Sequence, residues 1–432
     1  MKPAMAGPVA MKPAMTKPAA WPRGDASATR LLHVDPGARR RTARTALRHP
    51  AAARPESSER RGFVDGRIGD LRVLLREGDL LVVNDAATLP ASLRGVTGAG
   101  VAVEVRLTGS EGDGGCDGCW RAALFGAGDW RQRTEDRPPP PALGAGEELR
   151  FDGAGARGDD GRPGRPGRPL RATIAGVDAR SPRLVSLRFA ARGAALWRAL
   201  YRAGRPVQYA HTARPLALWQ VQTAYAARPW AVEAPSAGLA LSWELLLDLR
   251  RRGIAIARVT HAAGLSSTGD GALDARLPLA ERYEVPEETV RAVAAARRRG
   301  GRVVAVGTTA VRALEGDARS HRGRLIAGAG TTELRLGPAM RRRVVDGILT
   351  GVHDPGTSHF ALLESFAPRA LLLEAHAFAA ERGYLGHEFG DAMLILGEPR
   401  QARAAPGGAS IAPGDELEAT RERAPAAKLG GG

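Results

Sequence analysis

The sequence predicts an α/β protein in which a mainly parallel-sheet α/β domain carries an inserted small antiparallel β-barrel domain. Two observations lead to this fold class. After about residue 200, apolar strand-like segments alternate with helical ones, the order typical of a parallel sheet covered by helices. Between about 88 and 195, short strand-like segments are separated by Gly- and Pro-rich turns, which is typical of a small barrel or sandwich. A chain of 432 residues has room for both units.

The first elements of the α/β domain precede the insertion. Residues 71–75 predict the end of a helix, and residues 79–83 predict a strand of the same sheet as the later strands. The insertion then contains five predicted strands, at 101–107, 120–125, 148–151, 170–174 and 184–189. The barrel is therefore expected to interrupt a domain built from both ends of the chain.

Helix and strand signals alternate in the second half. Ser242 is a suitable N-cap for a helix through Leu249, and a strand is predicted over 254–260. Pro286 at the first helical position opens a second helix, which Gly300 and Gly301 end. The remaining elements are expected to be a strand at 302–306, a helix from 310, and strands at 344–349 and 392–396 with two helices between them.

These elements set the expected domain boundaries. The α/β domain takes residues 23–87 and 196–400, and the barrel takes residues 88–195. Residues 1–22 contain prolines throughout and repeat MKPAM, and they predict a disordered extension. Residues 401–432 are rich in Ala, Pro and Gly without hydrophobic periodicity, and they predict a disordered tail.

Composition limits the classes of function. With 63 Lys and Arg against 46 Asp and Glu, the net charge of +17 favours polyanionic partners, nucleic acid before membrane. No apolar run is long enough to span a membrane. The two cysteines, Cys116 and Cys119, are too few for a disulfide framework or a four-Cys zinc site. We expect a cytoplasmic protein with reduced cysteines, and a monomer.

Eight segments occur in the order of one known family. They read DASATRLLHVD at 25–35, GDLRVLLREGDLLVVNDAATLPASLRG at 69–95, QTAYA at 222–226, AVEAPSAGLALSWELL at 231–246, YEVP at 283–286, GGRVVAVGTTAVRALE at 300–315, RVVDGILTGVHDPGTS at 343–358 and GDAMLIL at 390–396. In these segments the chain resembles the S-adenosylmethionine:tRNA ribosyltransferase-isomerase family of queuosine biosynthesis, as a divergent member.

The resemblance implies a fold and a reaction. The fold is an α/β domain with an inserted β-barrel, in agreement with the pattern above. The reaction transfers and isomerises the ribosyl moiety of S-adenosylmethionine onto 7-aminomethyl-7-deazaguanine in tRNA, giving epoxyqueuosine, and it requires no metal. It needs a base beside the sulfonium, a hydrogen-bond donor for the departing adenine and a basic surface for tRNA. Carboxylates and aromatic faces are expected around the cationic sulfonium.

The candidate catalytic residues are His353 and Asp85. A histidine is the best proton carrier near pH 7, and His353 stands on a family loop motif; the alternative is a surface-loop histidine. Asp85 and its neighbour Asn84 follow a buried strand, so both are expected at the ligand-binding edge of the sheet. The alternative for this pair is an Asx turn.

The candidate substrate-binding residues come from several loops. Gly307, Thr308 and Thr309 form a strand-to-helix turn whose free N–H groups suit an anion, and Arg312 follows one turn later. For these residues, helix capping and a solvated arginine are the competing interpretations. The complete predicted set is Asn84, Pro235, Ser236, Gly238, Gly307, Thr308, Thr309, Arg312, Glu281 and Asp391.

Departures from the family pattern leave a second function open. Ala87, Ala240 and Gly351 stand where the family has Arg, His and Asn, and His261 is displaced by one position. The alternative is therefore a catalytically divergent paralogue that binds S-adenosylmethionine, a nucleoside or RNA without this reaction. No G-x-G-x-x-G follows a strand, so a Rossmann-type methyltransferase has little support.

Overall fold

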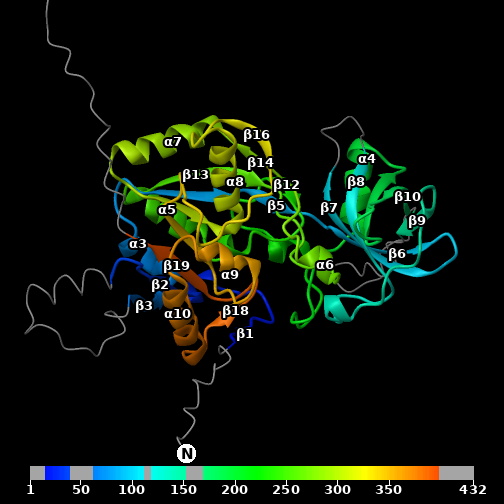
Figure 1. Ribbon diagram of the computed structural model, residues 1–432, viewed down its shortest axis with the longest axis horizontal. Coiled ribbons are helices and arrows are strands. Elements are labelled where there is room, and N and C mark those ends of the chain that lie inside the picture. The colour runs from blue at the N-terminus through cyan, green and yellow to red at the C-terminus, as the bar shows by residue number, and fades with distance from the viewer. Residues whose placement is uncertain (1–14, 39–61, 111–117, 152–168, 398–432) are drawn as a thin grey trace, which may run out of the picture. The chain divides into compact units, whose positions relative to one another are not determined.

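The computed structural model describes residues 15–38, 62–110, 118–151 and 169–397 (Figure 1). The expected disorder of 1–14 and 401–432 lies outside these residues, as does Cys116. Cys119 is disulfide-bonded, which differs from the expectation of reduced cysteines. No helix among the described residues combines the length and the apolar character that a membrane crossing requires.

A nine-stranded sheet forms the centre of the α/β part (Figure 1). Its strands, in spatial order, are β16 (Gly328–Thr332), β14 (Glu281–Val285), β13 (Ala255–His261), β4 (Leu80–Asn84), β15 (Val303–Val306), β17 (Gly347–Gly351), β19 (Ala392–Leu396), β2 (Arg30–Val34) and β3 (Phe63–Arg67). Strands β13, β4, β15 and β17 are parallel neighbours, as are β19 and β2.

The other neighbouring pairs in this sheet are antiparallel. The α/β class with an inserted barrel is thus confirmed, but the sheet is mixed rather than mainly parallel. The antiparallel pairs are β16–β14 and β14–β13 toward one edge, β2–β3 at the other edge, and β17–β19 within the sheet.

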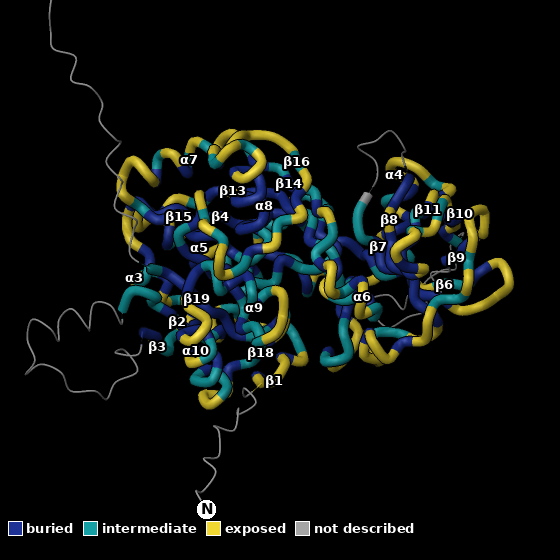
Figure 2. Tube along the Cα trace, in the orientation of Figure 1, coloured by how far each residue is buried: buried dark blue, intermediate teal, exposed yellow. Residues whose placement is uncertain are grey.

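Helices cover both faces of the sheet. The helices are α3 (Leu71–Leu74), α5 (Trp243–Arg251), α7 (Glu287–Arg298), α8 (Gly307–Ser320), α9 (Ser358–Leu363) and α10 (Arg369–Glu381). Residues of α7, α8, α9 and α10 pack on one face, and residues of α3 and α5 pack on the other. Exposed residues lie on the outer side of α7, whereas β4, β15 and β19 are buried throughout (Figure 2).

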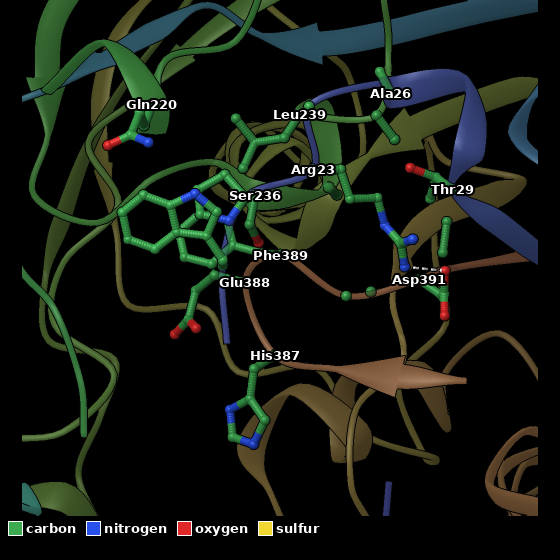
Figure 3. Close-up of a pocket in the computed structure, with 18 of the residues that line it drawn as sticks. Arg23, Ala26, Thr29, Gln220, Ser236, Leu239, His387, Glu388, Phe389 and Asp391 are labelled. Atoms are coloured by element: carbon green, nitrogen blue, oxygen red, sulfur yellow. Dashed lines mark hydrogen bonds and ion pairs between the residues drawn. The ribbon is translucent and has the colours of Figure 1, made fainter. Parts of the chain in front are cut away.

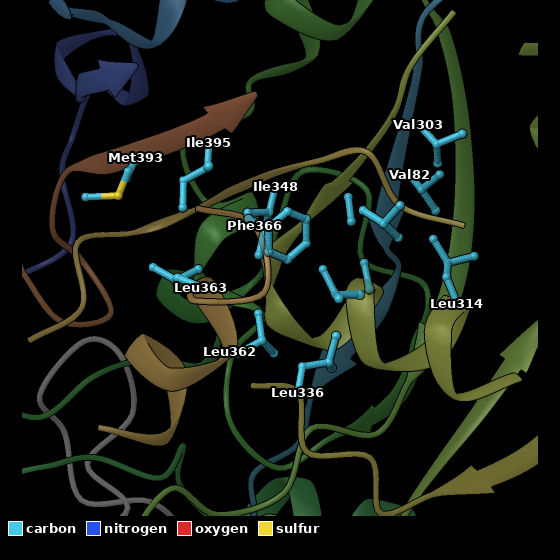
Figure 4. Packing of buried hydrophobic residues seen from close by; sticks show 14 of the residues in the cluster. Val82, Val303, Leu314, Leu336, Ile348, Leu362, Leu363, Phe366, Met393 and Ile395 are labelled. Carbon is cyan, nitrogen blue, oxygen red and sulfur yellow. The ribbon is translucent and has the colours of Figure 1, made fainter. Parts of the chain in front are cut away.

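Alternation along the strands places the two cores. In β4, Val82 packs with α8, while Leu81 and Val83 face α3 and α5. Val303 and Leu314 of the first core lie beside Val82 in Figure 4. The strands therefore read as continuous apolar runs, because both of their faces are covered.

Two local signals of the sequence appear in the structure as expected. The hydroxyl of Ser242 accepts a hydrogen bond from the N–H of Leu245 (3.3 Å) and caps α5. Pro286 precedes α7, at the N-cap rather than at the first helical position, and Glu287 and Glu288 occupy the first turn.

The inserted unit is a closed, six-stranded antiparallel barrel. Its strands are β6 (Ser92–Thr97), β7 (Ala102–Ser110), β8 (Cys119–Phe125), β9 (Glu148–Phe151), β10 (Leu170–Val177) and β11 (Leu184–Phe189). The helix α4 (Gly193–Ala203) packs on the barrel core through Leu196 and Leu200. Five of these strands were predicted, and β6 was missed because Gly95 interrupts its apolar pattern.

Two short strand pairs complete the fold. Strand β5 (Ala86–Thr88) pairs with β12 (Arg228–Ala231), directly before the barrel. Strand β1 (Lys17–Pro18) pairs with β18 (Leu385–Gly386). Residues 15–22, predicted as part of a disordered extension, thus belong to the folded protein. The N–H and hydroxyl of Thr16 also donate to Asp354 (3.2 and 3.0 Å), a contact that proline content alone does not reveal.

Candidate functional site

A cavity of about 560 Å³ opens between segments that are far apart in the sequence (Figure 3). Its walls come from 21–29, from 219–222, from the η7 turn (Ser236–Gly238) with Leu239 and Ala240, from the end of β17, and from the loop 387–392. Besides small and aliphatic residues, the lining contains aromatic side chains (Trp21, Trp219, Phe389), acidic ones (Glu388, Asp391) and polar or basic ones (Arg23, Thr29, Gln220, Gln222, Ser236, Thr350, His387). We call this space the cavity below.

The η7 turn supplies three of the predicted site residues. Ser236 lines the cavity directly, and Pro235 precedes it as the buried N-cap of the turn. At Gly238 a Cβ atom would lie 2.1 Å from the hydroxyl oxygen of Tyr225, so only glycine lets the turn pack on that ring. The small residues of this segment thus bring the backbone close to the cavity.

Gly307, Thr308 and Thr309 begin α8 directly behind the η7 turn. Gly307 has a φ of +83°, and a Cβ at this position would lie 3.5 Å from the Cβ of Ala237. The hydroxyl of Thr309 accepts a hydrogen bond from Asn84 Nδ2 (3.2 Å). Among the described residues these three support the wall and do not line the cavity.

Asn84 and Asp85 lie at the end of β4, as predicted, and are bound to the neighbouring strand. Asn84 Oδ1 accepts from the N–H of His261 (2.9 Å), and its Nδ2 donates to the carbonyl of the same residue (3.0 Å). Asp85 accepts from the hydroxyl of Thr260 (2.6 Å) and from Arg258 Nη1 (3.1 Å). Neither side chain lines the cavity.

Arg312 and Glu281 form a buried ion pair with His261 beside them. The side chains of Arg312 and Glu281 are 9% and 8% exposed, and His261 is fully buried with Nε2 3.3 Å from Glu281 Oε2. Burial raises the pKa of Glu281 against the opposing effect of Arg312, and it lowers the pKa of His261 well below 6.5, with Arg312 adding to this shift. Within the described residues, both ring nitrogens of His261 and Nη2 of Arg312 lack a hydrogen-bond partner.

Asp391 and His353 lie on the side of the cavity that is formed by the end of β17 and the loop 387–392. Asp391 accepts from Arg23 Nη2 (2.5 Å), from the N–H of Arg30 (3.0 Å) and from the N–H of Leu385 (2.8 Å). Figure 3 shows the Arg23–Asp391 pair at one end of the cavity, away from Glu388 and His387.

His353 stands one layer behind the cavity wall. Its Nε2 lies 2.8 Å from the hydroxyl oxygen of Thr350, which lines the cavity. Its ring stacks on His359 with centroids 4.9 Å apart and an interplanar angle of 15°. Burial, with His359 as a further cause, lowers the pKa of His353 well below 6.5, so the ring is neutral near pH 7.

The structure adds residues that the sequence reasoning missed. Trp21 and Arg23 come from a segment assigned to the extension or its border, and Trp219 is 71% exposed beside the cavity. Glu233 accepts hydrogen bonds from the hydroxyl of Tyr209 and from the N–H of Ser266 (2.8 Å). Burial raises the pKa of Glu233 to about 7, and nearby Glu388 contributes. In the sequence, the signal for Glu233 was its position as a carboxylate beside the small-residue loop.

Comparisons with known proteins decide the family. The sequence model of a family described as "Queuosine biosynthesis protein" matches residues 29–395, which is most of the chain. The chain belongs to this family. The match to the family begins directly before β2 and ends in β19, and it spans the whole barrel insertion.

Similar family members carry one name. Proteins named S-adenosylmethionine:tRNA ribosyltransferase-isomerase are 36% identical in Gloeobacter violaceus, over 80% of this chain and 91% of theirs, and 34% identical in a Methylobacterium species, over 85% and 92%. A crystal structure of S-adenosylmethionine tRNA ribosyltransferase from Thermotoga maritima covers 88% of this chain and 96% of its own, with 24% identity and a TM-score of 0.42.

Proposed function

We propose that this protein transfers and isomerises the ribosyl moiety of S-adenosylmethionine onto 7-aminomethyl-7-deazaguanine in tRNA, giving epoxyqueuosine and releasing adenine and methionine. The observation that carries this proposal is the similarity to relatives of that name, at 34–36% identity over at least four fifths of this chain. The proposal includes a cytoplasmic monomer, as expected from the sequence.

The cavity supplies a suitable environment for the sulfonium of the donor. Trp21, Trp219 and Phe389 offer aromatic faces, which attract a cation that has lost part of its hydration. Glu388 adds negative charge to the same lining, and the carboxylate of Asp391 is also there, paired with Arg23. Aromatic rings and carboxylates are the two kinds of side chain that a sulfonium site is expected to have.

His353 is our candidate for the proton transfer beside the sulfonium. Its neutral ring is the form that accepts a proton, and Thr350 connects it to the cavity. Asp85, whose oxygens are bound to Thr260 and Arg258, is better placed to position the end of β4 than to touch the donor. The net charge of +17 favours association with the polyanionic tRNA.

Adenine release tests the proposal directly. Purified full-length protein is incubated with S-adenosylmethionine, with and without tRNA that carries 7-aminomethyl-7-deazaguanine, and free adenine is quantified. The proposal predicts release that depends on the modified tRNA. Absence of adenine, although calorimetry shows S-adenosylmethionine binding, would reject the proposed reaction.

One observation favours the second candidate, a paralogue that keeps the ligand without the reaction. Ala240 and Gly351 both line the cavity, at positions where the family pattern has His and Asn. The nearest atoms to a Cβ at position 351 would be His353 Cε1 (3.8 Å), the carbonyl oxygen of His387 (3.9 Å) and His353 Nε2 (4.0 Å), all at ordinary contact distances, so a Cβ fits there. Under this alternative, the A87R/A240H/G351N variant gains adenine release; under our proposal it gains little.

A further inference from the structure

We propose that His211, His387 and Glu388 form a binding site for a divalent transition-metal ion such as Zn²⁺ at the edge of the cavity. The inference goes beyond the proposed reaction, for which the sequence resemblance implies no metal, and it can be tested without that reaction. It rests on the positions of three side chains that come from two separate segments of the chain.

The three side chains already converge. Each offers one ligand atom, and these atoms lie within 4.8 Å of one another. His211 Nε2 is 2.7 Å from Glu388 Oε2, and the rings of His211 and His387 have centroids 4.5 Å apart. Zn²⁺ binds such ligands at about 2.0–2.2 Å, which separates tetrahedral ligand atoms by roughly 3.4 Å. Small side-chain rotations therefore suffice to close the site.

The backbone and a neighbouring ring hold the ligands in place. His387 has a φ of +65°, a conformation that is uncommon outside glycine, and its carbonyl accepts from the N–H of Gly390 (3.1 Å). The ring of Tyr209 lies nearly parallel to that of His211, at 14° and 6.4 Å. The side chains of His211 and Glu388 are 14% and 28% exposed, whereas His387 is exposed, so the site is shielded on one side and reachable from the other.

The local charge also favours a cation. Glu388 and Glu233 repel each other, which contributes to the raised pKa of Glu233, and a bound cation would relieve this repulsion. Two imidazoles and a carboxylate are a ligand set that suits Zn²⁺, and three protein ligands leave a fourth position open. His387 and Glu388 line the cavity, so that position faces it. Figure 3 shows both on the same side of the cavity. The ion would there hold water or an oxygen or nitrogen donor of a molecule in the cavity.

A simple ion pair between His211 and Glu388 is the competing interpretation. It explains the 2.7 Å contact but gives no role to His387. The contribution of His387 to metal affinity therefore separates the two interpretations. His387→Asn is the informative variant, because asparagine tolerates a positive φ and the loop keeps its conformation.

The experiment uses the untagged full-length protein, freed of metal with a chelator. Zn²⁺ is titrated by calorimetry, and Co²⁺ is added to follow the visible absorption that nitrogen and oxygen ligation produces. The ligand variants are His211→Ala, His387→Asn and Glu388→Gln. The matched control is His321→Ala, which removes a histidine that also faces a carboxylate, that of Asp317 at 3.2 Å, and that belongs to no three-ligand cluster among the described residues.

The proposal predicts a specific Zn²⁺ site and a Co²⁺ spectrum in the wild-type protein. Each ligand variant, folded as judged by circular dichroism, should weaken Zn²⁺ binding by at least about 10–100-fold. Loss of a group that only hydrogen-bonds to a metal ligand already has an effect of this size. His321→Ala should bind as the wild type does. The proposal would be overturned if His387→Asn bound Zn²⁺ as tightly as the wild type. It would also be overturned if the wild-type protein bound no Zn²⁺, or bound it at a site that the three variants do not weaken. Because no donor or tRNA is present, this result is independent of adenine release.

Discussion

The guanidinium of Arg312 is paired with the carboxylate of Glu281 inside the protein, where α8 packs against β14. Both side chains are at least nine-tenths buried, and Arg312 Nε also donates to the carbonyl of Leu334 (3.1 Å). Sequence reasoning placed each residue separately in a substrate site. The structure brings the two together. The contribution of the pair to the stability of the fold can therefore be tested before any role in substrate binding.

Breaking this pair should be costly. Arg312→Met leaves the Glu281 carboxylate buried without its partner, and we expect the free energy of unfolding to fall by roughly 3–5 kcal/mol in urea titrations. The E281L/R312M variant should recover much of this loss, because no buried charge remains. Arg319→Met on the exposed end of the same helix is the control, with a change within about 0.5 kcal/mol. A loss below about 1 kcal/mol in Arg312→Met would contradict a buried pair.

Removal of the His353 ring should reduce the reaction rate without loss of donor binding. We expect His353→Ala to release adenine about 10²–10⁴-fold more slowly, with a similar calorimetric affinity for S-adenosylmethionine. His321→Ala, at a position that does not line the cavity, should keep full activity. Full activity in His353→Ala would remove this residue from the proton transfer and leave the base to another group.

The Arg23–Asp391 pair should couple the N-terminal segment to the cavity. Asp391 is 3% exposed, and Arg23→Met removes the one cationic side chain that pairs with it among the described residues. The backbone donors of Arg30 and Leu385 remain, so we expect a loss of roughly 1–3 kcal/mol in the free energy of unfolding. A chain that starts at residue 24 should lose more, because Trp21 and β1 go with it. Unchanged stability in both proteins would show that 15–23 do not form part of the fold.

Glu233 should make stability depend on pH. Its pKa is raised to about 7 from 4.5, mainly by burial, with Tyr209, Ser266 and Glu388 as neighbours and Arg106 facing the same network. Between these two values the folded state holds more protons than the unfolded state, so stability falls as pH rises from about 4.5 to 7.

Glu233→Gln removes this titration. Relative to this variant, the wild type should lose roughly 1–3 kcal/mol between pH 5 and pH 8, measured by urea unfolding with a chelator present. Parallel pH curves for the two proteins would mean that Glu233 keeps an ordinary pKa.

Local patterns predicted the elements well, because the forces involved are local. Ser242 caps its helix through a hydrogen bond three residues away, and the apolar run of β4 reflects a strand buried on both faces. The edge strand β16 and the barrel strand β6 were harder to recognise, since exposed or glycine-containing strands lack that run.

The cavity could be predicted only in part. Ser236 and Asp391 were found because each belongs to a short motif, but Arg23 and its partner Asp391 are 368 positions apart. Trp21 lies at the cavity because β1 pairs with β18, and His387 lies there because its backbone is left-handed. Such contacts depend on tertiary packing, which a single sequence does not encode in any local pattern.

The most direct test of the central claim is the mass of the modified nucleoside. Wild-type protein is incubated with S-adenosylmethionine and tRNA carrying 7-aminomethyl-7-deazaguanine, and the tRNA is digested and analysed by mass spectrometry. Our account predicts that this nucleoside converts to one with the added epoxycyclopentanediol mass, in proportion to the adenine released. An unchanged nucleoside, under conditions in which the donor binds, would contradict the assignment of this protein as an active ribosyltransferase-isomerase.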